Sequence, residues 1–323
     1  MPALTETKSF NSSFSFPTSG IPIAVLVGGS GGIGAAIAER LSYYAKGNIH
    51  IVILARNKEE SFKVLERCIP PPSGSGDVLR EFVLCDYSLV SSTDSAIKSV
   101  SDLLTANDHK IDYLVFSSNY VSLENKRNDT EEGHDYQLRI RYYHRFQMTY
   151  ALLSKGLLGP DSRVLTILGA QKKGIKVDVP GTDRDDFEFR SSEVGSFGKL
   201  GPVVASAYTD VGFKQLSAHF PKVGITHINP GFVYTGMIKG ILDDLRKKPF
   251  IGPLIYLLAK GVVSLVTIQP EESAEYMIYA LFNGKAGFYR RDKTGGELST
   301  VENEGLDSEK FYQHSMKVTK VDG

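Results

Sequence analysis

The sequence predicts an α/β protein in which one doubly wound parallel sheet carries helices on both faces. Short apolar runs alternate with helical periodicities along the chain, an order typical of parallel sheets with right-handed crossovers. A glycine-rich turn joins the first apolar run to the first helical pattern. The 323 residues are 41% hydrophobic, which is enough for one large core, and no internal repeat is visible.

The predicted elements follow one another in regular alternation. Strands are expected over residues 23–27, 50–56, 78–85, 111–117, 163–168 and 224–228. Helices are expected over residues 35–44, 58–68, 92–104, 136–155 and 201–220, then from Pro270 onward and over 304–320. Residues 1–20 are expected to form a disordered tail and residues 21–323 a single domain. Because ligands bind such sheets at the carboxyl ends of the strands, functional residues should lie just after each strand.

The glycine turn is the most informative motif in the chain. The apolar run 23–27 leads into glycines at positions 28, 29, 31, 32 and 34, and a helical pattern follows directly. This order is typical of a Rossmann-type dinucleotide site, where backbone N–H groups and a helix N-terminus meet a pyrophosphate. The residues expected to contact the cofactor here are Gly28, Ser30, Gly32, Ile33 and Gly34. The alternative is a tight strand–helix turn that holds no ligand.

Arg56 decides which dinucleotide the sequence favours. It follows the second predicted strand, where NAD-specific sites usually carry a carboxylate for the ribose hydroxyls. Neither Ala55 nor Asn57 supplies an acid, and an arginine suits a 2′-phosphate. We therefore expect NADP(H) in preference to NAD(H), the alternative being an ordinary surface arginine.

Residues after two further strands complete the predicted cofactor site. Asp86 follows the third strand and could accept a hydrogen bond from the adenine amino group, or simply neighbour a helix cap. Pro230, Gly231 and Thr235 follow the sixth strand, where the backbone could meet the nicotinamide carboxamide and Thr235 the phosphates. The alternative for this last segment is a plain turn.

Charge and composition exclude several classes of function. Lys plus Arg and Asp plus Glu both number 37, so there is no basic surplus for a nucleic-acid partner. Two cysteines exclude a disulfide scaffold and suit a reducing compartment, so a cytoplasmic location is expected. The apolar window 249–268 contains a lysine, proline and glycines, which argues against a membrane span. The histidines show no metal-ligand spacing, and no metal is expected.

The chain resembles the short-chain dehydrogenases/reductases over about Ile21 to Phe282. Its glycines match the glycine motif of that family, although Val27 replaces the usual threonine. Asp86 matches the aspartate of the adenine site, and the segment 230–235 matches the family's proline–glycine–threonine segment. Residues 117–119, by contrast, match the usual Asn-Asn-Ala-Gly turn poorly, while 130–133 and 270–276 resemble a divergent branch common in fungal genomes. The resemblance implies a homodimer or homotetramer.

The resemblance also implies four proton-handling residues, and the sequence departs from the pattern at each of them. Gly169 stands in place of the serine and Arg141 in place of the asparagine. Tyr208 has the local tyrosine signature, but Gly212 occupies the position of the lysine. Tyr208 also precedes Pro230 by 22 residues instead of about thirty, which displaces it by about 12 Å along a helix. We therefore disfavour Tyr208 as the catalytic tyrosine.

Three other residues are the candidates for contact with a substrate. Arg141 could hold a carboxylate or a developing oxyanion, unless it forms an ion pair with Asp178 or Glu131. Lys199 falls in the window expected for the missing tyrosine and could donate a proton. Gln171 follows the fifth strand and could donate a hydrogen bond to the substrate.

The substrate itself is expected to be a fairly large, apolar specialised metabolite. Residues 237–268 lie where this family places its substrate lid, and Phe250, Ile251 and 254–258 make that segment apolar. A core helix pair or a dimer contact would have the same composition. We expect an NADP(H)-dependent reductase of an iminium, conjugated or carbonyl substrate. The alternatives are a cofactor-assisted cyclase or isomerase that transfers no hydride, and a dinucleotide-binding pseudoenzyme.

Overall fold

The computed structural model describes residues 2–16, 20–106, 108–120, 127–171, 186–190, 197–247, 252–299 and 305–320. Within these ranges, the side chains of residues 197–202, 237, 241 and 252–254 are not described. The described residues form one sheet, whose strands are β1 (Ile23–Val27), β2 (His50–Ala55), β3 (Arg80–Leu84), β4 (Ile111–Phe116), β5 (Leu158–Ile167), β6 (Gly224–Ile228), β7 (Gly287–Arg291) and β8 (Glu297–Leu298).

The order of the strands creates a crevice at the carboxyl end of the sheet. The order is β3-β2-β1-β4-β5-β6-β7-β8, with every pair parallel except β7 and β8. The chain moves outward from β1 to β3 and then returns to β4 on the other side of β1. Neighbouring crossovers on either side of this switch point leave opposite faces of the sheet, so a ligand can bind between them. β1 and β2 are buried along their whole length, as their apolar runs predict.

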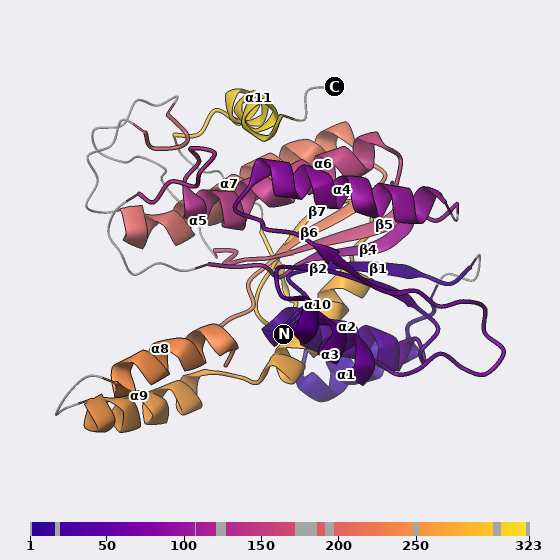
Figure 1. Cartoon of the computed structure of the whole chain (residues 1–323), viewed down its shortest axis with the longest axis horizontal. Coiled ribbons are helices and arrows are strands. Elements are labelled where there is room, and N and C mark those ends of the chain that lie inside the picture. Colours follow the sequence, from indigo (N-terminus) through magenta and orange to yellow (C-terminus); the bar gives the residue numbers. More distant parts are fainter. Residues whose placement is uncertain are drawn as a thin grey trace.

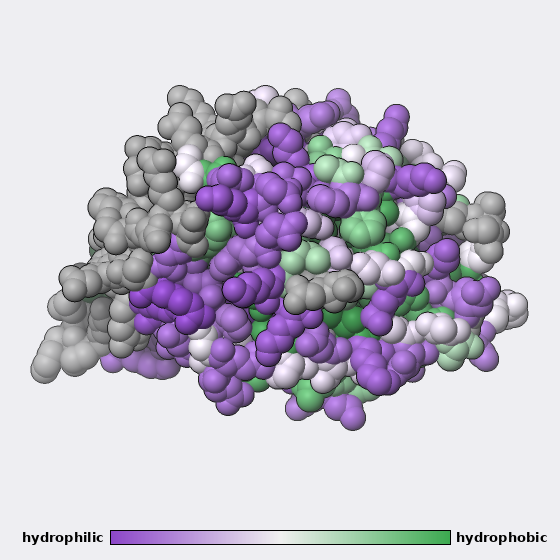
Figure 2. Space-filling model, turned by 90° about the horizontal axis from the view of Figure 1, so that it is seen from above, coloured by the Kyte–Doolittle hydropathy of each residue, from purple (hydrophilic) through white to green (hydrophobic). Residues whose placement is uncertain are grey.

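Helices cover both faces of this sheet, which confirms the predicted fold class (Figure 1). One layer contains α1 (Leu4–Ser13), α2 (Gly32–Tyr44), α3 (Lys58–Arg67) and α10 (Pro270–Phe282). The other contains α4 (Val90–Thr105), α5 (Tyr136–Leu138), η1 (Arg139–Tyr143), α6 (His144–Ser154), α7 (Phe197–His219) and α11 (Ser308–Thr319). Seen from the side of this second layer, the described surface is mainly hydrophilic, so its helices turn their apolar residues toward the sheet (Figure 2).

Two parts of the fold differ from the predicted elements. The helix expected over 136–155 is interrupted by η1, a π-helix of five residues, where the wider turn changes which side chains face the sheet. The last strands, β7 and β8, were not predicted. β7 has an irregular burial pattern, and its strand conformation depends on pairing with β6, a segment about sixty residues earlier in the sequence.

The predicted disordered tail over residues 1–20 is wrong for the residues that form α1. This helix packs on α10, and Asn11 is buried there. The Asn11 amide donates to the Glu275 backbone oxygen at 2.9 Å and to its Oε2 atom at 3.0 Å. Phe14, just after the helix, stacks on Phe282 with ring centroids 3.8 Å apart. Sequence periodicity could not reveal this anchoring, because the partners lie at the other end of the chain.

The segment predicted as a lid forms a helical hairpin. α8 (Gly236–Arg246) packs against α9 (Gly252–Val266), and the pair extends away from the sheet at the lower left of Figure 1. Leu257 and Leu258, predicted to make the lid apolar, are 64% and 66% exposed. Phe250 and Ile251 lie outside the described residues.

Candidate functional site

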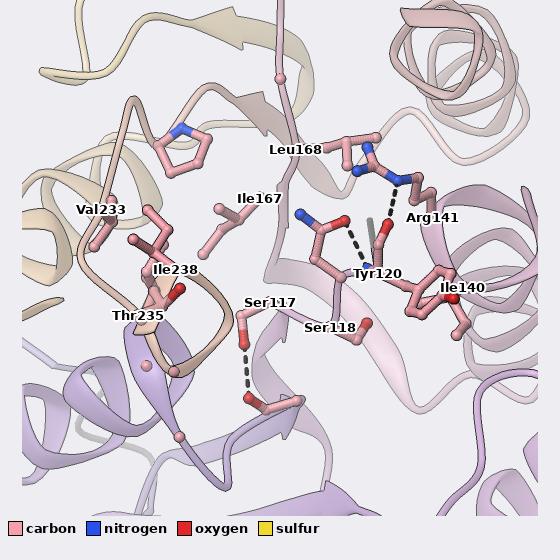
Figure 3. Close-up of a pocket in the computed structure, with 18 of the residues that line it drawn as sticks. Ser117, Ser118, Tyr120, Ile140, Arg141, Ile167, Leu168, Val233, Thr235 and Ile238 are labelled. Atoms are coloured by element: carbon pink, nitrogen blue, oxygen red, sulfur yellow. Dashed lines mark hydrogen bonds between the residues drawn. The ribbon is translucent and has the colours of Figure 1, made fainter. Parts of the chain in front are cut away.

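A cavity of about 530 Å³ lies at the carboxyl end of the sheet, across the switch point between β1 and β4. Its walls come from the glycine turn after β1, the ends of β4 and β5, the π-helix η1 and the segment after β6 (Figure 3). These segments are far apart in sequence, and the parallel sheet brings their ends together. The cavity thus occupies the place where an open α/β sheet binds its ligands.

The glycine turn leaves no room for side chains at two of its positions. Gly28 has φ +92°, and a Cβ there would lie 2.5 Å from the backbone nitrogen of Ser118. A Cβ at Gly34 would overlap the carbonyl oxygen of Gly28 and the hydroxyl of Ser117, so the start of α2 packs directly on the turn. Gly31 is different, because it lines the cavity and a Cβ there would meet no heavy atom within 4 Å.

The predicted cofactor residues line the cavity, with the exceptions of Gly34 and Asp86, which are not among the described lining residues. Arg56 lines the cavity as an exposed side chain, and its Nη1 atom donates to the Tyr136 hydroxyl at 3.3 Å. Ser30, Gly32, Ile33, Pro230, Gly231 and Thr235 line it as well. The Oδ1 atom of Asp86 instead accepts from the amide and the hydroxyl of Ser88.

Arg141 reaches the cavity from η1 and is 4% exposed. Its Nε atom donates to the carbonyl oxygen of Tyr120 at 2.7 Å (Figure 3), and Leu168, just after β5, lines the same cavity. No ion pair joins it to Glu131, and Asp178 lies outside the described residues. Burial lowers the pKa of Arg141 to about 10, which leaves the side chain charged at neutral pH.

Ser118 and His144 form a hydrogen-bonded pair at the wall of the cavity. The Ser118 Oγ and His144 Nε2 atoms are 2.8 Å apart, and His144 Nδ1 lies 3.1 Å from the carbonyl oxygen of Arg139. Because a carbonyl oxygen can only accept, Nδ1 carries the proton and Ser118 donates to Nε2. Burial, with the charges of Arg145 and Arg139, holds the pKa of His144 well below its usual value. The imidazole therefore stays neutral and is a poor reservoir of protons.

Tyr208 lies in the hydrophobic core and is not among the described lining residues. It is 1% exposed, its hydroxyl donates to the Phe187 carbonyl oxygen at 2.8 Å, and its ring packs on Phe311 with centroids 4.3 Å apart. Four residues on, the space beside Gly212 is filled by the phenol of Tyr142. This packing leaves no room for a side chain at the position that a tyrosine–lysine pair would require.

The two remaining candidates for contact with a substrate are Gln171 and Lys199. Gln171 is not among the described lining residues. Its side chain turns back to donate to the Gly169 carbonyl oxygen at 2.9 Å, and its backbone oxygen accepts from Arg290. Lys199 lies in the first turn of α7, but its side chain is outside the described part of the structure.

Sequence reasoning missed several residues that line the cavity. Tyr87, Ser118, Asn119 and Tyr120 contribute from the ends of β3 and β4. The signal that could have found them is their position directly after a predicted strand, but their side chains match no motif. The described lining contains two tyrosines, Tyr87 and Tyr120, and no lysine. Tyr87 donates its proton to the Leu54 carbonyl oxygen at 2.5 Å.

No cluster of three or more His, Cys, Asp or Glu side chains within the described ranges is arranged to hold a metal ion. No helix within those ranges has the length and apolar character needed to span a membrane.

The chain has relatives among fungal proteins. The oxidoreductase andH of Emericella variicolor is 26% identical over 280 residues, which cover 86% of this chain and 74% of that protein. An NmrA-like family domain-containing oxidoreductase, notO, of an Aspergillus species is 26% identical over 224 residues, covering 67% of this chain and 62% of that protein. This chain therefore spans less than two thirds of the length of the second relative. No protein-family model matches the sequence.

Solved structures resemble the fold more extensively. Actinorhodin polyketide ketoreductase with NADPH superposes with a TM-score of 0.54 at 18% identity, covering 85% of this chain and 97% of that one. A short-chain dehydrogenase/reductase from Serratia marcescens gives a TM-score of 0.52 at 16% identity, with 85% and 98% covered. A 3-oxoacyl (acyl-carrier-protein) reductase from Agrobacterium tumefaciens with NADP bound gives 0.52 at 18%, with 86% and 95% covered. These likenesses show that the chain has the fold of these reductases.

Proposed function

We propose that this chain, which has the fold of the short-chain dehydrogenases/reductases, is an NADP(H)-dependent oxidoreductase with a non-standard active site. The observation that carries the proposal is the cavity between the glycine turn and the 230–235 segment, at the switch point of the sheet. The related fungal proteins are named oxidoreductases, which supports a redox reaction over simple nucleotide storage. The apolar lining supports an apolar substrate, for which we propose a specialised metabolite.

The residues present fit a dinucleotide. Backbone N–H groups of the turn and the N-terminus of α2 would hold the pyrophosphate, and Gly31 leaves open space there. Thr235 faces the same turn from the 230–235 segment. Arg56, exposed at the wall of the cavity, would pair with a 2′-phosphate, which is the basis for NADP(H) over NAD(H).

The bound cofactor would supply a hydride, and the lining limits which substrates could accept it. Reduction of a ketone needs a proton donor, whereas an iminium ion becomes a neutral amine on hydride addition alone. The described lining contains no lysine, and the Ser118 proton is shared with the neutral His144. We therefore propose an iminium substrate, or a conjugated or carbonyl substrate whose anionic reduction product is protonated by Tyr120 or by Lys199.

Replacing Arg56 by glutamate tests the cofactor assignment. The wild type should bind NADPH more tightly than NADH, measured by nucleotide fluorescence. The Arg56→Glu variant should weaken NADPH by roughly 10–100-fold, because a charge-assisted pair with the 2′-phosphate is lost. NADH, which lacks that phosphate, should change much less. Equal losses for both nucleotides would refute the phosphate contact. Lys98→Glu, an exposed charge reversal on α4, is the control.

The lack of a lysine in the described lining also favours a second function, a cofactor-assisted cyclase or isomerase. The two functions differ in whether nucleotide is consumed. A reductase removes one NADPH for each product, so absorbance at the reduced nicotinamide band falls in step with product. Product formation without that fall would establish the non-redox reaction. A chain that binds NADPH but forms no product would be a pseudoenzyme.

We also propose that the protein is a homo-oligomer, with α9 in the contact. Five apolar side chains on this helix are more than half exposed: Leu257, Leu258, Val262, Leu265 and Val266. Replacing Leu258 and Leu265 together by aspartate should shift sedimentation from dimer or tetramer to monomer. Ser264→Asp adds charge to the same helix and should leave the assembly intact. A wild type that sediments as a monomer would rule the contact out.

We also propose that the protein is located in the cytoplasm. The two cysteines, Cys68 and Cys85, are buried free thiols, as a reducing compartment would leave them. Microscopy of the tagged full chain tests this location.

A further inference from the structure

One of the three guanidinium nitrogens of Arg141 is hydrogen-bonded to a described residue. Its Nε atom donates to the Tyr120 carbonyl oxygen, while its two terminal nitrogens have no hydrogen-bond partner among the described residues. Leu168, an apolar side chain, lines the same cavity. This arginine is 4% exposed and lines the cavity, so a ligand there could accept hydrogen bonds from its terminal nitrogens.

A second buried arginine near Arg141 adds positive charge that no described carboxylate balances. Arg145 lies one helical turn further on and is fully buried. All of its described hydrogen-bond partners are neutral, namely the Thr166 hydroxyl and the carbonyl oxygens of Ile167 and Ser118. Arg141, in the wall of the cavity, therefore has a second positive side chain close behind it. The charge of Arg141 contributes to a lowered pKa of Arg145, after the larger effect of burial.

The acidic side chains described around this helix are engaged elsewhere. Glu132 accepts from the amide nitrogens of Val90 and Ser91 at the start of α4. Asp135 caps the amide of Leu138 at 2.8 Å, and Asp94 accepts from the side chain of Gln147. None of these carboxylates forms an ion pair with Arg141. The compensating negative charge is thus missing from the described part of the chain.

The position of Arg141 separates it from the cofactor phosphates. Thr235 and the glycine turn lie on one side of the cavity, while Arg141 and Leu168 lie on the other (Figure 3). The same cavity is lined by five aliphatic side chains, Ile140, Ile167, Leu168, Val233 and Ile238, and also by the hydroxyl side chains of Ser117 and Ser118. A planar guanidinium at an apolar wall matches an apolar molecule that ends in two coplanar oxygens.

We propose that the substrate is an apolar molecule bearing a carboxylate, and that Arg141 holds this carboxylate through its two terminal nitrogens. This proposal rests on the proposed function, because it takes the other side of the same cavity for the nucleotide. Arg141 then determines specificity and orientation: it fixes one end of the substrate, while the apolar wall accommodates the remainder.

Calorimetric titration with a matched pair of probes tests the proposal. The probes are 4-phenylbutyrate and 4-phenylbutyramide, which differ only in the charged group. The wild type, with and without NADPH, should bind the carboxylate at least about 10-fold more tightly than the amide. Arg141→Gln should remove that preference and leave NADPH affinity within about twofold. Arg141→Lys, which keeps the charge but lacks the planar fork, should retain part of it.

Arg56→Glu is the matched control, since this arginine lines the same cavity. It should lose NADPH affinity and keep the preference for the carboxylate. Equal binding of the two probes by the wild type would overturn the proposal whether or not Arg141→Gln folds, and so would undetectable binding of the carboxylate. A preference that persists in Arg141→Gln would also overturn it. Failure of NADPH to bind would defeat the proposed function, whereas the probe comparison without nucleotide would still decide the role of Arg141.

Discussion

Replacing Gly31 by aspartate is expected to weaken both NADPH and NADH by about 1,000-fold without lowering the melting temperature. Gly31 lines the cavity, has an extended backbone with φ −176°, and has room for a side chain. Aspartate is also a favourable N-cap for α2, so the fold should tolerate it. Its carboxylate would stand where we propose the pyrophosphate, and repulsion between like charges costs several kcal/mol there.

The effect of this change should not depend on the 2′-phosphate, which separates it from the effect of Arg56→Glu. Fluorescence titration of each nucleotide and a thermal melt are the required measurements. Gly76→Asp is the control, because it adds the same charge to an exposed loop position where a Cβ would make only an ordinary contact, 4.0 Å from Ile21 Cδ1. Unchanged nucleotide affinity in Gly31→Asp would place any dinucleotide away from the glycine turn.

Introducing a lysine at Gly212 would restore the spacing of a tyrosine–lysine pair in sequence, yet we expect it to destabilise the protein. A Cβ at this position would overlap the phenol of Tyr142. Tyr142 is fully buried and hydrogen-bonded to Ser315 at 2.8 Å, so it cannot move away easily. Overpacking costs about 1–3 kcal/mol, and an uncompensated buried charge adds about 3–5 kcal/mol. The expected result is a large fall in melting temperature or loss of soluble protein.

Two further variants separate the steric part of this effect from the charge. Gly212→Ala should destabilise by about 1–3 kcal/mol in a denaturant titration, since it adds only the overlapping methyl group. Gly240→Ala, in α8, adds a methyl group that meets no heavy atom within 4 Å and should not destabilise. Combining Gly212→Ala with Tyr142→Leu should cost less than the sum of the single changes. A Gly212→Lys protein that melts like the wild type would show that this packing is wrong.

The sequence predicted the sheet well because its evidence is local. The apolar run of β1, the glycines after it and the helical pattern of α2 are adjacent in the chain, and their order alone indicates the strand–turn–helix unit. The same holds for β6, whose bounds Gly224–Ile228 agree with the prediction. Elements that depend on distant partners were missed, namely α1 on Glu275 and β7 beside β6.

In the candidate site too, the sequence predicted what depends on local spacing and missed the contacts between distant segments. Spacing along the chain was enough to question Tyr208, because helical rise converts residue number into distance. It could not reveal that Tyr142 fills the space beside Gly212, since that contact joins two different helices. Nor could it orient Gln171, which turns toward the carbonyl oxygen of Gly169.

By itself, the sequence determined the α/β class, the glycine turn and the alternation of strands with helices, because these follow from residues that are neighbours in the chain. Only the tertiary structure decided which side chains share the cavity. It places Arg56 and Arg141 at one cavity and surrounds Arg145 with neutral acceptors. The physical reason is that burial and charge compensation are properties of three-dimensional neighbours, which spacing in the sequence does not specify.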